Sequence, residues 1–368
     1  MSVILPYIIG SFVVSWLCGM ISIPLVIRFC NSRGILDQPN VRKVHKSGVP
    51  RLGGVCFVPS MLVAFVGALL LLNYNSPDGM VTANLWSCMF LVSLLLIYVT
   101  GLIDDLAGIN AKAKFVVQIV AASVLPACSL YINNLYGFLG IYEIPAYIGV
   151  PLTILAMVFV NNAMNLIDGI DGLCGSLSLM VLAGFLYCFV AEGLTVYGLL
   201  IAALMGTLAA FLRYNLFGDE RHHRKIFMGD SGSLTLGFIL GFLMVKYSMH
   251  NPSVMPYNAD HIMLATTLLL VPCFDVVRVV ISRMAHRRGI FTADKNHIHH
   301  KLLRAGLGQH QALAVILLMA VFYFILNMVL SFATIYFSLI IVIDIVLWAI
   351  GNAVLNAVIR RHGGEPFV

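Results

Sequence analysis

Long apolar stretches separated by short polar segments dominate the pattern of residues along the chain. Crossing a hydrocarbon core takes about 20 helical residues, and helices satisfy their own backbone hydrogen bonds inside lipid. The pattern therefore predicts an all-α, polytopic integral membrane protein with about eleven transmembrane helices. We expect these helices at residues 3–27, 53–72, 85–103, 115–131, 144–160, 173–190, 195–212, 234–245, 261–281, 312–330 and 335–358. The eighth stretch is too short to cross alone and should borrow a turn from each side.

Composition and charge placement support this architecture and orient it. Of the 368 residues, 60% are hydrophobic and 10% are charged, whereas a soluble domain is roughly a quarter charged. The formal charge of +6 is divided among short loops, which argues against a nucleic-acid partner. If the first helix runs inward, all of the 22 basic residues except Lys246 lie on the inner side. The positive-inside rule then predicts an outer amino end and a cytoplasmic carboxyl end.

The chain shows no internal repeat, low-complexity tract or long linker. We therefore expect residues 1–368 to form a single membrane-embedded catalytic domain whose active site is built from cytoplasmic loops. Four inner segments contain most of the residues suited to chemistry, and each adjoins the end of a predicted span.

The first segment ends the third span with two adjacent carboxylates, Asp104 and Asp105. Adjacent acids repel each other and are costly near hydrocarbon unless a cation or a proton transfer uses them. A solvated helix end is the alternative interpretation.

The second segment, residues 161–172, interrupts two apolar stretches with three Asn and two Asp residues. Asp168 and Asp171 are three apart and would share a face in a helical turn. Asn165 lies on the same segment, and the glycines beside the acids permit close approach of a ligand. A turn rich in Asn, Asp and Gly is the alternative.

The third segment, Met-Gly-Asp-Ser-Gly-Ser at residues 228–233, opens the eighth span. We interpret Asp230 as a ligand of a hard cation at the start of a helix. The backbone N–H groups of the opening turn are available to an anion. A simple helix cap made by Asp230 or Ser231 is the alternative. Gly-Asp-Ser-Gly also occurs in chymotrypsin-like proteases, but that chemistry needs a β-barrel with a positioned His and Asp.

The fourth segment contains three histidines, His297, His299 and His300, in an inner loop with several Arg and Lys residues that include Arg283. These basic residues favour an anionic ligand such as a pyrophosphate. A transition-metal site and a solvated polar loop remain as alternatives. A further basic segment at residues 42–54 contains His45 and Lys46, which either hold phosphate charge or only enforce orientation.

Together, these segments from Arg42 to about Leu303 resemble the polyprenyl-phosphate N-acetylhexosamine-1-phosphate transferase family. The run His-Ile-His-His at residues 297–300 is similar to that of the undecaprenyl-phosphate N-acetylglucosamine-1-phosphate transferase branch. The muramoyl-pentapeptide transferase branch has a different histidine run and is kept as the alternative. The resemblance implies a Mg²⁺-dependent enzyme, with Mn²⁺ as a substitute, in the bacterial inner membrane. It would transfer N-acetylglucosamine-1-phosphate, or a related N-acetylhexosamine-1-phosphate, from the UDP-sugar to undecaprenyl phosphate and release UMP.

The resemblance also implies roles for single residues. Asp230 matches the metal-binding aspartate, and Asp105 is expected to join it. Asp104 and Asp105 match the acidic pair near the acceptor phosphate, and Asp168 and Asp171 match the second essential pair. The substrate contacts are expected from His45, Lys46, Asn165, Asn215, Phe227, Arg283, His297, His299 and His300. The expected partners are undecaprenyl phosphate, the UDP-sugar and membrane lipid, without nucleic acid, and a homodimer is compatible with them.

Phosphoryl transfer between two anions needs a metal and basic side chains to offset their charge. We expect Asp104 to deprotonate or orient the lipid phosphate, which then attacks the sugar-bearing phosphorus directly. A two-step route through an aspartyl phosphate remains open. An ion-coupled transporter is a rival function, but it would place its acids near the membrane midplane, and only Asp344 fits that position. A membrane metalloprotease would need a His-Glu-x-x-His pattern, which the chain lacks.

Overall fold

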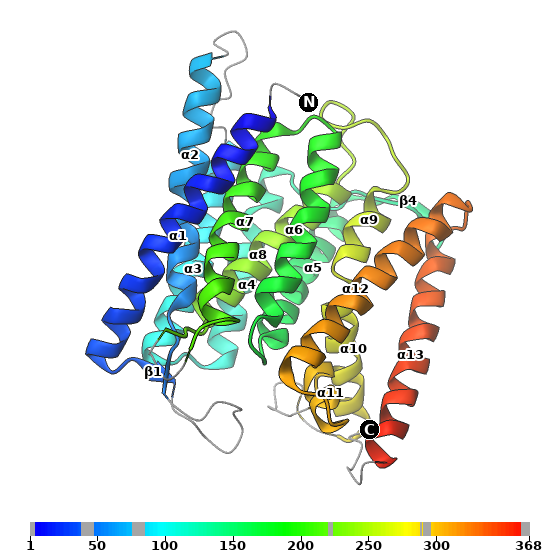
Figure 1. Ribbon diagram of the computed structural model, residues 1–368. Helices are drawn as coiled ribbons and strands as arrows, with labels where there is room; N and C mark the ends of the chain where they lie inside the picture. Colours follow the sequence, from blue (N-terminus) through cyan, green and yellow to red (C-terminus); the bar gives the residue numbers. More distant parts are fainter. Residues whose placement is uncertain are drawn as a thin grey trace. The chain divides into compact units, whose positions relative to one another are not determined.

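The computed structural model describes residues 4–37, 48–75, 85–219, 224–287, 289 and 296–361, and helices account for most of them (Figure 1). The helices are α1 (Leu5–Arg33), α2 (Phe57–Asn75), α3 (Leu85–Ala107), α4 (Ala111–Val124), α5 (Ala146–Ile167), α6 (Leu173–Ala191), α7 (Thr195–Asn215), α8 (Asp230–Ser248), α9 (His261–Leu268), α10 (Leu270–Ala285), α11 (Ile298–Arg304), α12 (Gln309–Phe332) and α13 (Phe337–Arg361). Two short 3-10 helices, η1 (Gly53–Cys56) and η3 (Pro126–Cys128), adjoin α2 and α4.

The helices confirm the predicted all-α, polytopic architecture. Within the described residues, 10 helices are long and apolar enough to cross a membrane, and α9 with α10 adds one span that is bent by 68°. The eighth span is α8, whose 19 residues extend the apolar run at both ends, as expected. The span predicted for residues 261–281 is present as two helices, and the bend between them was not predicted. The orientation of the two termini stays a prediction.

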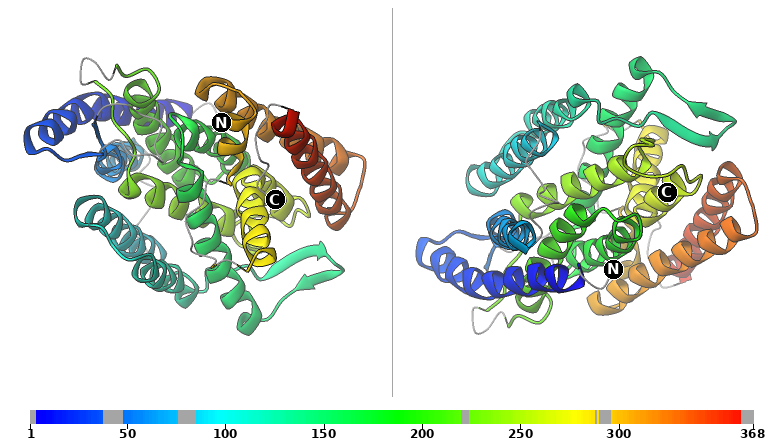
Figure 2. Two further views of the ribbon diagram at one scale, coloured as in Figure 1. Left: turned by 90° about the horizontal axis from the view of Figure 1, so that it is seen from below. Right: turned by 90° about the horizontal axis from the view of Figure 1, so that it is seen from above.

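Two short antiparallel strand pairs were not predicted. Strand β1 (Leu36–Asp37) pairs with β2 (Val49–Pro50), and β3 (Asn134–Phe138) pairs with β4 (Ile141–Glu143). The β3–β4 hairpin connects the segment after α4 to α5, and Figure 2 shows its two strands in both views. Its turn is fixed by a hydrogen bond from the Leu139 N–H to the Ser338 hydroxyl on α13, at 2.7 Å.

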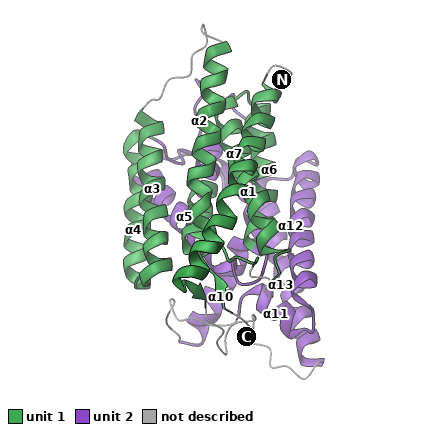
Figure 3. Cartoon of the chain, turned by 60° about the vertical axis from the view of Figure 1, so that its left-hand side comes forward, with its two compact units in different colours: residues 1–129, 174–240 green, residues 130–173, 241–368 purple. Residues whose placement is uncertain are grey.

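The contacts divide the chain into two compact units, coloured in Figure 3. Unit 1 comprises Met1–Ser129 and Cys174–Leu240, and unit 2 comprises Leu130–Leu173 and Gly241–Val368. The expectation that residues 1–368 act as a single catalytic domain stays a prediction. Each unit is described by itself below.

In unit 1, α1, α2 and α7 pack against one another. Small residues let α1 and α7 approach closely: a Cβ on Gly19 would lie 2.7 Å from the Ala210 Cβ, and a Cβ on Gly206 would lie 2.2 Å from the Phe12 carbonyl oxygen. Close backbone approach through small residues is a common way for helices to pack in membranes.

In unit 2, α10 contacts both α5 and α12, and α11 contacts α12 and α13. Asn327 on α12 donates its two amide hydrogens to Thr267 Oγ1 and to Asp344 Oδ2, both at 2.9 Å. This contact ties together α9, α12 and α13 and gives the buried Asp344 a partner. The one acid that the sequence placed inside a span is therefore part of an interhelical contact.

Candidate functional site

The first acidic pair lies in the last turn of α3, and the chain then turns sharply into α4. The N–H of Gly108 bonds to the Asp104 carbonyl at 2.8 Å, and the glycine has a φ of 75°, so it closes α3. The Asn110 side chain then accepts a hydrogen bond from the Lys112 N–H and caps α4. This turn returns the first residues of α4 to the carboxylates at the end of α3.

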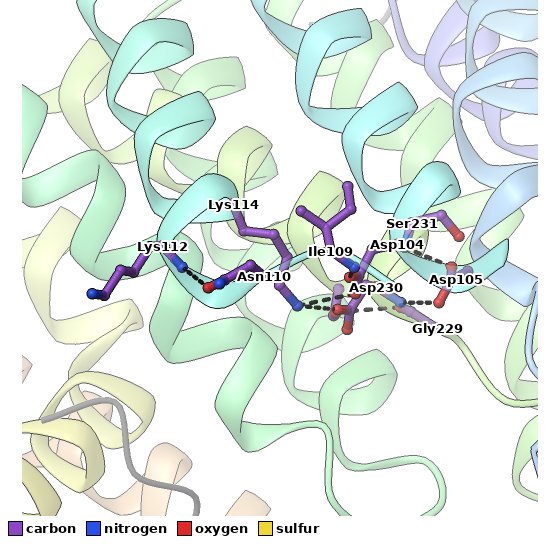
Figure 4. Close-up of polar contacts among 10 residues, drawn as sticks. Asp104, Asp105, Ile109, Asn110, Lys112, Lys114, Gly229, Asp230 and Ser231 are labelled. Carbon is purple, nitrogen blue, oxygen red and sulfur yellow. Dashed lines mark hydrogen bonds and ion pairs between the residues drawn. The ribbon is translucent and has the colours of Figure 1, made fainter. Parts of the chain in front are cut away.

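Lys114, on the first turn of α4, bridges two of the predicted acids. Its Nζ lies 2.9 Å from Asp104 Oδ2 and 2.7 Å from Asp230 Oδ2 (Figure 4). The side chains are partly shielded from solvent, with relative exposures of 21% for Lys114, 12% for Asp104 and 27% for Asp230. A cation thus holds together acids that are far apart in sequence. Lys112, two residues earlier, is exposed and points away from them.

Asp105 has a different task from its neighbour. Its Oδ1 accepts a hydrogen bond from the Asp230 N–H at 2.8 Å, and its Oδ2 accepts one from the Ser231 N–H at 2.9 Å. These N–H groups open α8, whose first-turn donors have no partner inside the helix. Asp105 is buried, so α3 caps α8 through a carboxylate and fixes the place of Asp230.

The backbone around Asp230 is packed too tightly for side chains at two glycines. Gly229 has a φ of 74°, and a Cβ there would lie 2.2 Å from the Arg51 carbonyl oxygen. A Cβ on Gly54 would lie 2.0 Å from the Gly232 nitrogen. The N–H of Gly54 also bonds to the Met228 carbonyl at 2.7 Å. The end of the basic segment therefore packs directly on the start of α8.

Asn215 and Phe227, both expected to contact the substrate, precede Asp230 in the chain and lie in the same unit. The Asn215 amide donates to the Ile226 carbonyl at 2.9 Å and is buried. Phe227 is half-buried, and the Lys225 Nζ lies 5.9 Å from its ring centre. Asn215 thus positions the strand-like stretch that leads into Asp230.

In unit 2, the second and fourth predicted segments meet. Asp168 ends α5, Asn165 lies one turn before it, and Asp171 follows in the turn that leads to α6. A Cβ on Gly169 would lie 2.0 Å from His299 Nε2, so the glycine between the two acids touches this imidazole. The turn that carries Asp168 and Asp171 therefore contacts the histidine run through Gly169.

The histidine run begins α11 and is anchored to α10. His297 Nδ1 lies 2.8 Å from Asp275 Oδ2, and the Ile298 N–H donates to Asp275 Oδ1 at 2.9 Å. The rings of His297 and His299 are nearly parallel, with centres 6.0 Å apart, and the ring of His300 follows 4.2 Å from that of His299. Arg283, on α10, is buried in the same unit.

The charges of this loop are set by burial. Burial lowers the pKa of His299 to about 3, and the nearby His300 lowers it as well, so His299 is neutral at pH 7. Both ring nitrogens of His299 are buried and lack a hydrogen-bond partner among the described residues. Burial also lowers the pKa of Lys301 to about 8, and Arg278 lowers it further by repulsion. The arginines are therefore the most secure positive charges of this loop at neutral pH.

The structure brings the predicted residues together in two groups. Unit 1 gathers the first and third segments, with Asn215 and Phe227 nearby, and unit 2 gathers the second and fourth. His45 and Lys46 lie outside the described residues.

Sequence reasoning missed Lys114 and Asp275. Lys114 could have been found as a lysine that closely follows the acidic pair and a capped turn. Asp275 could have been found as an acid within an apolar run, one helical turn before Arg278.

A divalent cation fits the oxygen atoms of unit 1. Mg²⁺ usually takes one or two carboxylates and completes its shell with water and phosphate oxygens. Asp104 and Asp230 direct oxygens at a single point, where Lys114 now supplies the positive charge. Across the described residues, no group of three or more His, Cys, Asp or Glu side chains could enclose a metal ion. The chain thus offers an open, two-carboxylate site.

Comparison with known proteins places these groups in context. Residues 87–248 match the family described as Glycosyl transferase family 4, a range that contains Asp104, Asp105, Lys114, Asp168 and Asp230. The chain is 30% identical, over 93% of its length and 90% of the relative, to the probable undecaprenyl-phosphate N-acetylglucosaminyl 1-phosphate transferase of Bacillus subtilis. It is 28% identical, over 78% of its length and 74% of the relative, to the undecaprenyl-phosphate alpha-N-acetylglucosaminyl 1-phosphate transferase of Yersinia pestis. It is 31% identical, over 80% of its length and 74% of the relative, to the decaprenyl-phosphate N-acetylglucosaminephosphotransferase of Mycolicibacterium smegmatis.

Proposed function

The chain belongs to glycosyl transferase family 4, the family of the polyprenyl-phosphate N-acetylhexosamine-1-phosphate transferases, and from this premise we propose its reaction. It transfers N-acetylglucosamine-1-phosphate from UDP-N-acetylglucosamine to undecaprenyl phosphate. A lipid phosphate oxygen bonds to the sugar-bearing phosphorus, the bond between the two phosphates of the donor breaks, and UMP leaves. The product is a lipid-linked sugar diphosphate that starts a cell-envelope glycan.

The observation that carries this proposal is the bridge from Lys114 to Asp104 and Asp230. A reaction between two anions needs positive charge at the point where they meet. The bridge supplies one permanent cation and two carboxylates suited to Mg²⁺, which would offset charge on the phosphates when bound. We assign Asp104 and Asp230 to the metal, and Asp105 to holding the start of α8 in place.

The acceptor is assigned to unit 1. Asp104 receives the proton of the lipid phosphate or orients its attacking oxygen, and Lys114 attracts the phosphate to the same point. The first N–H groups of α8 are already bonded to Asp105, so they fix the carboxylates and do not bind the phosphate themselves.

The donor contacts are assigned to the acids and histidines of unit 2, and the expected substrate contacts of Asn215 and Phe227 are considered within unit 1 alone. Asp168 and Asp171 flank a glycine that touches His299, and Arg283 supplies a permanent positive charge. Because His299 is neutral at pH 7, it would donate or accept a hydrogen bond and add no charge.

The reaction is proposed to occur at the cytoplasmic face of the bacterial inner membrane, where the basic residues gather under the positive-inside rule. Single cysteines introduced at exposed Lys112 and at exposed Tyr142 of β4 can be labelled in intact cells with a membrane-impermeant maleimide. Labelling of the cysteine at position 112 from outside would refute this orientation.

The test of the reaction uses the purified chain in detergent with UDP-N-acetylglucosamine, undecaprenyl phosphate and Mg²⁺. Release of UMP with formation of the lipid product is expected, EDTA should abolish it, and added Mg²⁺ should restore it. No UMP from the wild type would overturn the proposal. A panel of UDP-sugars, including UDP-N-acetylmuramoyl-pentapeptide, separates the two branches, and acid-quench trapping of a phosphorylated aspartate would replace direct transfer by the two-step route.

A further inference from the structure

Asp275 lies on α10, outside every segment that the sequence identified, yet its carboxylate is almost fully buried, with 1% exposure. One face of α10 carries it together with Arg278 and Ser282, at spacings of three and seven residues. All three side chains reach the segment that begins α11. Burying a carboxylate is costly unless several hydrogen bonds compensate for the lost water.

Those hydrogen bonds all concern the start of the histidine run. Oδ2 of Asp275 pairs with His297 Nδ1 at 2.8 Å, and Oδ1 accepts from the Ile298 N–H at 2.9 Å and from Arg278 Nη2 at 2.8 Å. Arg278 Nη2 also donates to the Asn296 carbonyl oxygen. One buried acid thus fixes both the backbone and the first imidazole of the loop.

The pairing has a direct chemical consequence for His297. A carboxylate at Nδ1 favours the tautomer that carries its proton there, because a carboxylate can only accept. It leaves Nε2 as the nitrogen available to a ligand, and that atom has no hydrogen-bond partner among the described residues. The ring of His299 lies nearly parallel to that of His297, with centres 6.0 Å apart.

We propose that Asp275 is a positioning residue: it holds the His297 imidazole in one tautomer and orientation, with Nε2 directed to an oxygen of the anionic donor. This rests on the proposed function for the identity of the donor. Asp275 acts through His297 and does not contact the substrate. Carboxylates that orient a histidine commonly change affinity or activity by about 10- to 100-fold when removed.

The experiment compares Asp275→Asn, His297→Gln and the double variant in the UMP assay. Asp275→Asn keeps the shape but loses an acceptor oxygen. We expect it to lower kcat/KM for UDP-N-acetylglucosamine by about 10- to 100-fold, with no change in the KM for undecaprenyl phosphate. If Asp275 acts through His297, the double variant should be no worse than His297→Gln alone. Multiplying losses, or an equal rise in both KM values, would overturn the proposal.

Two further measurements separate positioning from folding and from the proposed function. In ¹⁵N-histidine NMR of the whole protein, the His297 signal, identified by its loss in His297→Gln, should change its tautomer pattern in Asp275→Asn; an unchanged pattern overturns the proposal even if no activity is found. Asp344→Asn is the matched control, because Asp344 is equally buried in the same unit and bonded to Asn327. It should leave donor KM and the His297 signal unchanged.

If Asp275→Asn does not fold, Asp275→Glu replaces it in both measurements. A wild-type NMR pattern together with a wild-type donor KM in that variant refutes the proposal. Absence of UMP from the wild type would refute only the reaction.

Discussion

Replacing Lys114 with alanine removes the ammonium group that Asp104 and Asp230 share. The two carboxylates face the same Nζ from 2.9 and 2.7 Å, so they lie close together and repel each other once the ammonium is gone. At an effective dielectric constant of about 20, two unit charges about 4 Å apart repel by roughly 4 kcal/mol. Partial exposure of all three side chains reduces this figure. The change should therefore alter the local charge more than it alters global folding.

The variant should change two kinetic quantities: it should lower kcat, and it should strengthen the apparent binding of Mg²⁺. Loss of the ammonium removes a group that stabilises negative charge on the reacting phosphates, and the loss of one such group typically lowers kcat by about 10²- to 10³-fold. Because Lys114 now occupies the point where the two carboxylates converge, its loss also leaves them freer to bind Mg²⁺. We expect the half-saturating Mg²⁺ concentration to fall while kcat falls as well.

The assay is UMP release in detergent at saturating donor and acceptor across a Mg²⁺ titration. Lys112→Ala is the matched control, since it removes a lysine from the same turn of α4 that is exposed and contacts neither acid. It should retain the kcat and Mg²⁺ dependence of the wild type. The assigned role is wrong if kcat of Lys114→Ala stays within about threefold of the wild-type value, because the loss of one such contact should lower kcat far more. It is also wrong if the variant needs more Mg²⁺ than the wild type.

Four further outcomes are expected. Asp105→Ala leaves two first-turn N–H groups of α8 without their acceptor, which should cost about 1–3 kcal/mol and lower the thermal unfolding midpoint; an unchanged midpoint contradicts the capping role. Gly54→Ala places a Cβ 2.0 Å from a backbone nitrogen and should abolish UMP release, whereas Gly67→Ala, whose Cβ meets nothing within 4 Å, should be silent. Gly169→Ala pushes a methyl group into a buried imidazole and should raise the KM for the UDP-sugar, and a wild-type KM would exclude that contact. Lys301 has a folded pKa of about 8, below its ordinary 10.5, so the unfolded chain holds more protons between these values and stability should rise with pH there; Lys301→Met should lose this part of the rise in a thermal unfolding series from pH 7.5 to 10.

Hydropathy predicted the spans well because lipid imposes one rule on every segment that crosses it. The same rule could not reveal the bend between α9 and α10, since the residues next to the break at Leu269 are apolar on both sides. Pro272 was a local signal, because proline leaves the carbonyl four residues before it without an N–H partner. The β3–β4 hairpin is short and depends on a contact with α13 that lies far away in sequence.

Candidate site residues could be proposed from the sequence where they stand out as polar in apolar surroundings. Asp104, Asp168 and Asp230 were proposed for that reason, and their roles stay predictions. Lys114 was not, because its direction depends on how Gly108 and Asn110 turn the chain between α3 and α4. The sequence also could not separate the tasks of two adjacent acids: Asp104 faces the lysine, whereas Asp105 faces backbone N–H groups.

Every residue of α8 after Asp230 is buried, and α8 has the lowest mean hydropathy of the 10 described helices long enough to span. A helix that touches no lipid has no need of an apolar exterior, which explains why small and hydroxyl residues are tolerated on it. During synthesis, however, such a helix gains little by entering lipid alone. We therefore expect its integration to depend on the helices made before it, so that Asp230 at its start reaches its place only after much of the surrounding protein has been inserted.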